Sequence, residues 1–172
     1  MNVPTEIAAD AYQADSNRTQ SPAQVWQQLR ARDTTKSLSD QQVWDMVALA
    51  WRSNTTPDRL AEGKKLYAEN CAACHGETGK CEGVMAASLR KAAPADMPGT
   101  PAPDAGAGAV GHETVTPIDF TDARNLLGAN SAILQGKIVR GGMGTGMPYW
   151  GPIFTEAQIW ALVDYLWTFQ FD

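Results

Sequence analysis

Residues 71–75 read Cys71-Ala72-Ala73-Cys74-His75, and this stretch decides how the rest of the chain is interpreted. On a helical turn, two cysteines three positions apart lie on one face, so both thiols can reach the two vinyl groups along one haem edge. The histidine that follows directly is placed to bind the iron. The motif therefore predicts covalent attachment of a c-type haem through Cys71 and Cys74, with His75 as an axial ligand.

Two other kinds of site use the same cysteine spacing. A zinc site would need further cysteine or histidine ligands, and only Cys81 and His112 remain in the sequence to supply them. A thioredoxin-like redox pair would need a βαβ setting, whereas the residues that flank this motif have a helical pattern. Because a motif this short can occur by chance, the haem interpretation needs a second, distant signal.

The second signal is the glycine-rich stretch 140–150, which reads RGGMGTGMPYW. A methionine thioether often binds the haem iron opposite the histidine and raises the reduction potential. Two methionines of this stretch compete for that role. Pro148 fixes its own φ and biases the backbone of Met147 towards an extended form, whereas Met143 lies between two glycines. We therefore expect Met147 to be the second axial ligand, with Met143 as the alternative.

Taken together, these stretches resemble the class I, monohaem c-type cytochromes of bacteria. The resemblance covers about residues 59–169 and includes residues 63–67 (GKKLY), the CAACHG core, residues 119–122 (DFTD), GMPYWG and a closing helix from Thr155. It implies an all-α class I cytochrome c fold around one covalent haem c, with residues 58–172 as the cytochrome domain. It also implies side chains that pack on the haem or meet its propionates: Phe120, Arg140, Tyr149 and Trp150, with Arg124 as a further candidate.

The resemblance implies two more contacts. Gly63 and Tyr67 would let the first helix of the domain cross the closing helix closely, opposite Leu162 and Tyr165. A glycine inside a helix costs about 1 kcal/mol, and a close backbone approach would compensate for that cost. A backbone carbonyl near Val84 would accept the Nδ1 hydrogen of His75 and fix its ring.

Residues 1–57 are expected to form an N-terminal arm and a two-helix extension. One helix should begin after Ser21, with Pro22 in its first turn, and a second after Ser39. Residues 38–51 align without gaps on residues 154–167, so that Trp51 corresponds to Trp167. This match is either convergence on a common capping arrangement or the mark of a preceding cytochrome-like domain whose haem half is absent. We favour the second interpretation slightly.

Residues 92–117 form a Pro/Ala/Gly-rich stretch that resembles a long insertion in a loop that is short in this family. It is expected to be either a cover on the haem edge or a mobile excursion. Met97 and His112 lie in it and are expected at the loop surface. Cys81 is expected to be a buried free thiol; an intermolecular disulfide is the second reading and haem ligation the least favoured.

With both axial positions filled, the expected function is electron transfer between redox protein partners, a donor and an acceptor of a respiratory or related chain, rather than catalysis. The alternatives are the haem module of a larger membrane oxidoreductase complex, or a haem enzyme or gas sensor with a labile sixth ligand. A net charge of −5 argues against nucleic acid as a partner. The sequence contains no apolar run of about 18 residues, the length that spans a membrane. Since the family attaches haem outside the cytoplasm, we expect a periplasmic protein, in a mature or truncated form.

Overall fold

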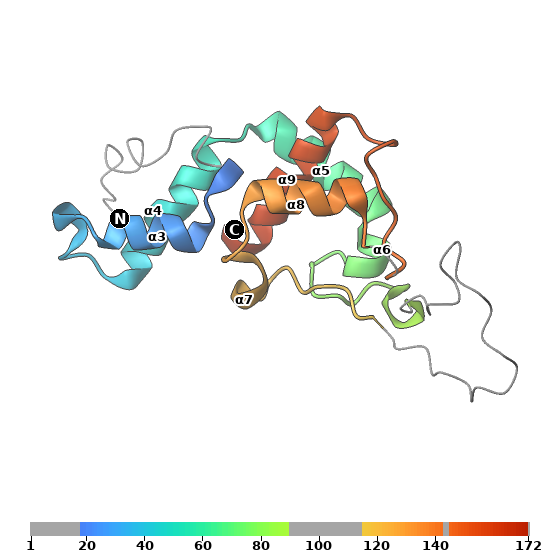
Figure 1. Ribbon diagram of the computed structural model, residues 1–172, viewed down its shortest axis with the longest axis horizontal. Coiled ribbons are helices and arrows are strands. Elements are labelled where there is room, and N and C mark those ends of the chain that lie inside the picture. The colour runs from blue at the N-terminus through green and yellow to red at the C-terminus, as the bar shows by residue number, and fades with distance from the viewer. Residues whose placement is uncertain (1–17, 90–114, 143–144, 172) are drawn as a thin grey trace, which may run out of the picture.

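In the computed structural model, residues 18–89, 115–142 and 145–171 are described (Figure 1). Within these ranges the chain is helical, and the only pairing of β type is an isolated bridge between Gly142 and Met147. None of the helices in these ranges has the length and apolarity needed to cross a membrane. The elements, in chain order, are α3 (Pro22–Arg30), η1 (Asp33–Thr35), α4 (Asp40–Ser53), α5 (Pro57–Asn70), α6 (Ala72–His75), η2 (Ala86–Ser88), α7 (Ala123–Leu126), α8 (Ser131–Arg140) and α9 (Glu156–Phe171).

The predicted helix starts are confirmed, and each is fixed by local hydrogen bonds. Ser21 and Ser39 form reciprocal capping boxes with the glutamine three positions on, which satisfy backbone N–H groups that the first turn leaves free. Thr155 does the same at the start of α9, where its Oγ1 accepts from the backbone N–H of Gln158 at 3.3 Å and its own N–H donates to the Gln158 side chain at 3.0 Å.

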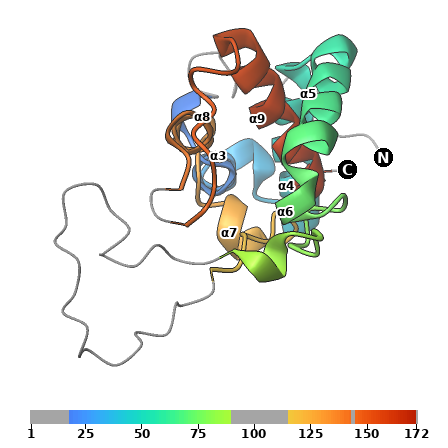
Figure 2. The same ribbon diagram turned by 90° about the vertical axis from the view of Figure 1, so that its right-hand side faces the viewer.

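The helices α5 and α9 cross closely, and Gly63 makes the crossing possible (Figure 2). A Cβ added at Gly63 would lie 2.8 Å from the carbonyl carbon of Ala161 and 2.8 Å from the Cβ of Tyr165. The expected crossing is therefore present, with Tyr165 opposite the glycine as predicted. Ala161, which the sequence did not single out, also lies at this contact, and Leu162 is buried in the core.

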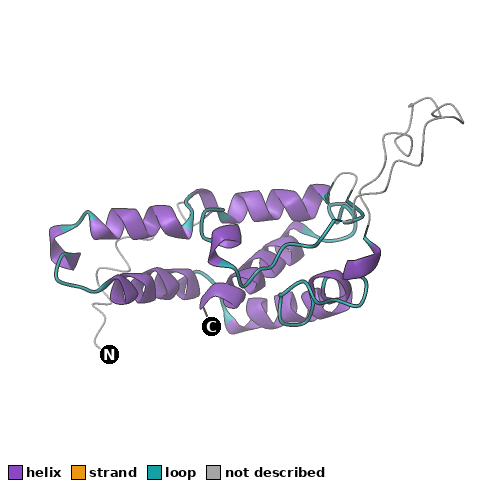
Figure 3. Cartoon of the chain, turned by 90° about the horizontal axis from the view of Figure 1, so that it is seen from below, coloured by secondary structure: helices purple, strands orange, loops and turns teal. Residues whose placement is uncertain are grey.

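The N-terminal helices α3 and α4 lie at one end of an elongated molecule and α6 lies at the other (Figures 1 and 3). The indole of Trp51 contacts that of Trp167, with 5.4 Å between ring centroids. The backbone N–H of Ala23 donates to the carbonyl of Leu127 at 3.0 Å, and Asn130 donates to the carbonyl of Thr19 at 2.8 Å. One continuous apolar core therefore runs from α3 through α9.

Candidate functional site

Cys74 and His75 of the motif lie on α6, a single helical turn, and Cys71 is the capping residue between α5 and α6. The Cys71 N–H donates to the carbonyl of Tyr67 at 2.8 Å, and the His75 N–H donates to the carbonyl of Cys71 at 2.9 Å. Gly76 then leaves the helix with φ +80°. Its carbonyl accepts the buried hydroxyl of Tyr67 at 2.8 Å, so a side chain of α5 fixes the turn after the histidine.

The loop that follows folds back on this turn. The Cys81 N–H donates to the carbonyl of His75 at 2.9 Å, and the Met85 N–H donates to that of Ala73 at 2.8 Å. Cys81 is half-buried rather than buried, and its backbone has a positive φ of 57°.

The His75 ring is oriented by a segment far along the chain. Its Nδ1 lies 3.4 Å from the carbonyl oxygen of Ile118, and its ring stacks on that of Phe120 with 4.6 Å between centroids. The expected carbonyl near Val84 is thus replaced by that of Ile118. Burial lowers the pKa of His75, which favours the neutral imidazole that binds metal ions. Nδ1 is directed to a protein carbonyl, so Nε2 is the nitrogen available to a metal.

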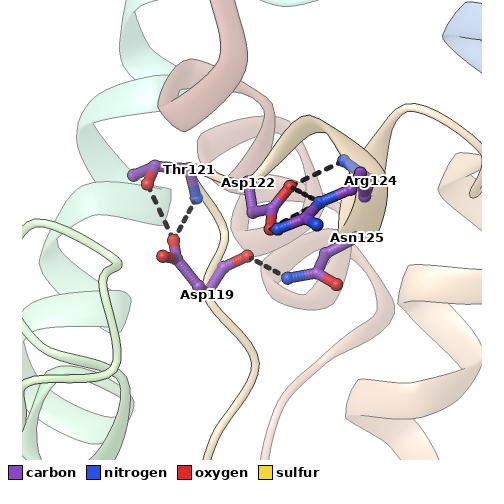
Figure 4. Close-up of polar contacts among 5 residues, drawn as sticks. All are labelled: Asp119, Thr121, Asp122, Arg124 and Asn125. Atoms are coloured by element: carbon purple, nitrogen blue, oxygen red, sulfur yellow. Dashed lines mark hydrogen bonds and ion pairs between the residues drawn. The ribbon is translucent and has the colours of Figure 1, made fainter.

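A compact turn braces the segment that holds His75 (Figure 4). Asp119 accepts from the N–H of Thr121 at 2.8 Å and from its hydroxyl at 2.7 Å. Asp122 caps α7 and pairs with the Arg124 guanidinium at 2.6 Å, and this pairing lowers the pKa of Asp122. The Arg124 guanidinium is therefore directed to its own neighbour, and its suggested role with a haem propionate stays a prediction. Asn125 donates to the Asp119 carbonyl at 3.0 Å and closes the turn.

The methionine stretch forms a narrow loop between α8 and α9. The N–H of Gly142 donates to the carbonyl of Met147 at 3.2 Å, which closes the loop at its base. Gly141 has φ +65°, and a Cβ added there would lie 2.6 Å from the Met147 carbonyl oxygen, so only glycine fits. The Trp150 N–H donates to the carbonyl of Ile138 at 3.1 Å and holds the end of the loop against α8.

The turn of residues 71–75 and the methionine loop meet around one cavity of about 330 Å³. The side chains of Cys71, Cys74 and His75 line it from that turn, and Met147 and Trp150 line it from the methionine loop. The structure therefore brings both sequence signals to one place.

Other predicted residues lie elsewhere. Phe120 lies behind His75 rather than on the described cavity wall, from which Arg140 and Tyr149 are also absent. Lys137 lines the cavity and was not singled out from the sequence; it lies on α8 one turn before Arg140. Met97, His112 and Met143 fall outside the described residues. Within those residues no three His, Cys, Asp or Glu side chains cluster to hold a metal ion.

A cytochrome c family model matches residues 60–170 of the sequence. The chain belongs to the cytochrome c family. The matched region contains both walls of the cavity, and the family agrees with the all-α fold.

Among solved structures, a chain of the reducing HAO-like protein complex of Kuenenia stuttgartiensis is similar at 17% identity, with a TM-score of 0.52. The match covers 87% of this cytochrome and 72% of that chain, so the likeness of fold reaches beyond the region of the family model. A comparison with curated proteins found no match.

The residues present fit the haem c that the cytochrome c family binds. Two thiols, an imidazole and a thioether line one cavity, the first three from residues 71–75 and the last from the loop after α8. Burial raises the pKa of the Cys71 thiol to about 12, so in the chain without haem this group is a neutral thiol at physiological pH. Covalent thioether bonds would remove this ionisable group altogether.

Proposed function

We propose that this cytochrome carries single electrons between protein partners through one covalently bound haem c. Cys71 and Cys74 would hold the group, with His75 and Met147 as its axial ligands. The observation that supports the proposal is the cavity itself, whose wall includes both His75 and Met147 although the two lie far apart in the chain. When bound, the haem supplies a one-electron couple whose potential depends on the axial ligands and their hydrogen bonds.

Residues of the protein would keep the two axial ligands in place when the iron gains or loses an electron. Ile118 and Phe120 restrain the His75 ring on one side. The bridge between Gly142 and Met147 restrains the methionine on the other. Rigid ligands favour electron transfer because little of the structure has to rearrange when the charge changes.

A pair of methionine substitutions tests the proposal. Met147→Leu keeps the bulk and removes the sulfur, so it should abolish the sulfur-to-iron charge-transfer band of the oxidised protein and lower its reduction potential. Met143→Leu is the matched control and should retain the band. The reverse pattern would move the ligand to Met143, and a band unaltered in both variants would exclude the loop as its source and point to Met85 or Met97.

Two measurements test covalent attachment. The mass of the denatured protein should exceed that of the polypeptide by one haem, and the pyridine haemochrome spectrum should be that of haem c. A spectrum typical of haem b would refute attachment through Cys71 and Cys74.

A second candidate is a haem module of a larger oxidoreductase assembly, with residues 1–57 as its joint. The similar chain from Kuenenia stuttgartiensis comes from a protein complex, and α3 and α4 extend the molecule at the end away from α6. In either role we propose that the protein works outside the cytoplasm. Ready binding of carbon monoxide to the reduced protein, at an iron that lacks Met147 or releases it, would instead favour a gas sensor or enzyme with an open iron site.

A further inference from the structure

A second cavity, of about 310 Å³, lies at the opposite end of α5 from the haem-binding cavity. Pro57 and Leu60, in the first turn of α5, line the second cavity, whereas Asn70 at the other end of the helix lines the first. The rest of its wall includes three aromatic rings from α4 and α9 and polar residues beside them: Arg52, Thr55, Thr56, Ser131, Asp164 and Thr168. Trp51 contacts Trp167 at 5.4 Å and Phe171 at 5.8 Å between ring centroids.

This cavity lies between α4 and α9, the two helices whose sequences match. In the register that aligns residues 38–51 with 154–167, three pairs of equivalent positions line it, namely Trp51 with Trp167, Arg52 with Thr168, and Thr55 with Phe171. Equivalent positions face each other where two copies are related by an approximate two-fold axis. The cavity is therefore formed where α4 packs against α9.

One carboxylate contributes to the wall of this aromatic cavity. The Asp164 side chain is 18% exposed, and its Oδ2 pairs with the Arg59 guanidinium at 2.8 Å and accepts the Thr55 hydroxyl at 2.8 Å. Both of these contacts, made within the described part of the chain, use Oδ2. The other oxygen, Oδ1, is thus the acceptor that remains for a molecule in the cavity.

The size of the cavity and its wall indicate the class of molecule that fits. An engineered apolar cavity of about 150 Å³ in another protein holds one benzene ring, so this cavity has room for a fused two-ring system. Pockets for small molecules are commonly aromatic, with few polar groups, and lie between structural units. We propose that this cavity binds a small, flat aromatic molecule that carries one hydrogen-bond donor, with its rings against Trp51 and Trp167 and its donor on Asp164. Such a molecule would contact α4, α5 and α9 together and so tie the N-terminal extension to the haem domain.

Indole and indene provide matched probes, because they share a shape and differ in that indole alone has an N–H donor. Titration calorimetry on the full-length protein with its haem should show indole binding at least ten-fold more tightly than indene. Asp164→Asn removes the charge from the acceptor, so this ratio should fall towards one. Leu60→Phe fills the cavity from α5 and should abolish binding of both probes.

Asp40→Asn is the control, because Asp40 pairs with Arg30 at 3.2 Å on the N-terminal helices and does not line the cavity. This variant should bind indole as the parent does. Absence of indole binding overturns the proposal. Equal affinity for the two probes, or unchanged affinity in Leu60→Phe, also overturns it. Haem spectra and reduction potentials measured on each variant separate this outcome from the electron-transfer proposal.

Discussion

Replacing Gly63 by alanine should destabilise the protein, although the same change stabilises most helices. Alanine gains about 1 kcal/mol over glycine in a helix interior. At Gly63, however, the new methyl group would lie 2.8 Å from the carbonyl carbon of Ala161 and 2.8 Å from the Cβ of Tyr165. Neither atom can rotate away, because one belongs to the backbone of α9 and the other is fixed to it.

The two helices would therefore have to separate. Overpacking of this kind costs up to about 3 kcal/mol, and subtracting the helix gain of about 1 kcal/mol leaves a net loss of about 2 kcal/mol. For a urea dependence of about 2 kcal/mol per molar, the unfolding midpoint should fall by about 1 M. Far-ultraviolet circular dichroism of the haem-loaded protein in urea measures this shift.

Gly136→Ala is the matched control, since Gly136 also lies inside a helix, α8. A Cβ there would meet only the end of the Arg140 side chain, at 3.2 Å, and that guanidinium can move. This variant should gain up to about 1 kcal/mol. If Gly63→Ala were stabilised to the same degree, the close crossing of α5 and α9 would be refuted.

Three further changes test the histidine turn and the junction with the extension. Tyr67→Phe removes the donor to the Gly76 carbonyl and should cost about 1–2 kcal/mol in urea unfolding, and an unchanged midpoint would contradict the role of that bond. Phe120→Leu removes the ring stacked on His75, so the electron paramagnetic resonance spectrum of the oxidised protein should change, whereas Phe154→Leu, which removes a ring stacked on Trp150, should leave the His75 orientation intact. Burial raises the pKa of Asp164 above its ordinary value, so the folded state holds that proton more tightly than the unfolded state. The stabilisation of the folded state by protonated Asp164 should be complete at pH values below the pKa of Asp164 in the unfolded chain, and it should decline as pH rises through the pKa in the folded protein. If the urea midpoint depended on pH in the same way in Asp164→Asn, that result would argue against this.

Much of the site could be predicted because its chemistry is local in sequence. The cysteines and His75 are adjacent, and the restriction that Pro148 places on Met147 acts between neighbours. The contacts that were missed depend on tertiary structure. Ile118 reaches His75 only because the chain returns there after residues 90–114, and nothing in the sequence near His75 signals that carbonyl. Lys137 and Arg140 lie one turn apart on α8, so the pattern alone could not say which of the two meets the cavity.

Ala161 was not singled out at the α5 crossing for a similar reason. Adjacent positions on a helix differ by about 100° in direction, so Ala161 and Leu162 lie on different faces. A small residue opposite Gly63 is the better expectation, because a close approach needs little bulk on both sides.

Ala161 also helps to interpret the N-terminal extension. Every buried residue of α4 corresponds to a buried residue of α9 in the 38–51 to 154–167 register: Val43 with Ile159, Met46 with Leu162, Val47 with Val163, Ala50 with Leu166 and Trp51 with Trp167. The buried residue of α9 without such a counterpart is Ala161, where α5 crosses; its equivalent is Asp45, which is half-buried and accepts a hydrogen bond from Gln41. Capping alone would match the first turn and leave later positions free to differ. We therefore infer that α4 shares with α9 the face that packs in the core, and that the face which on α9 receives α5 is polar on α4.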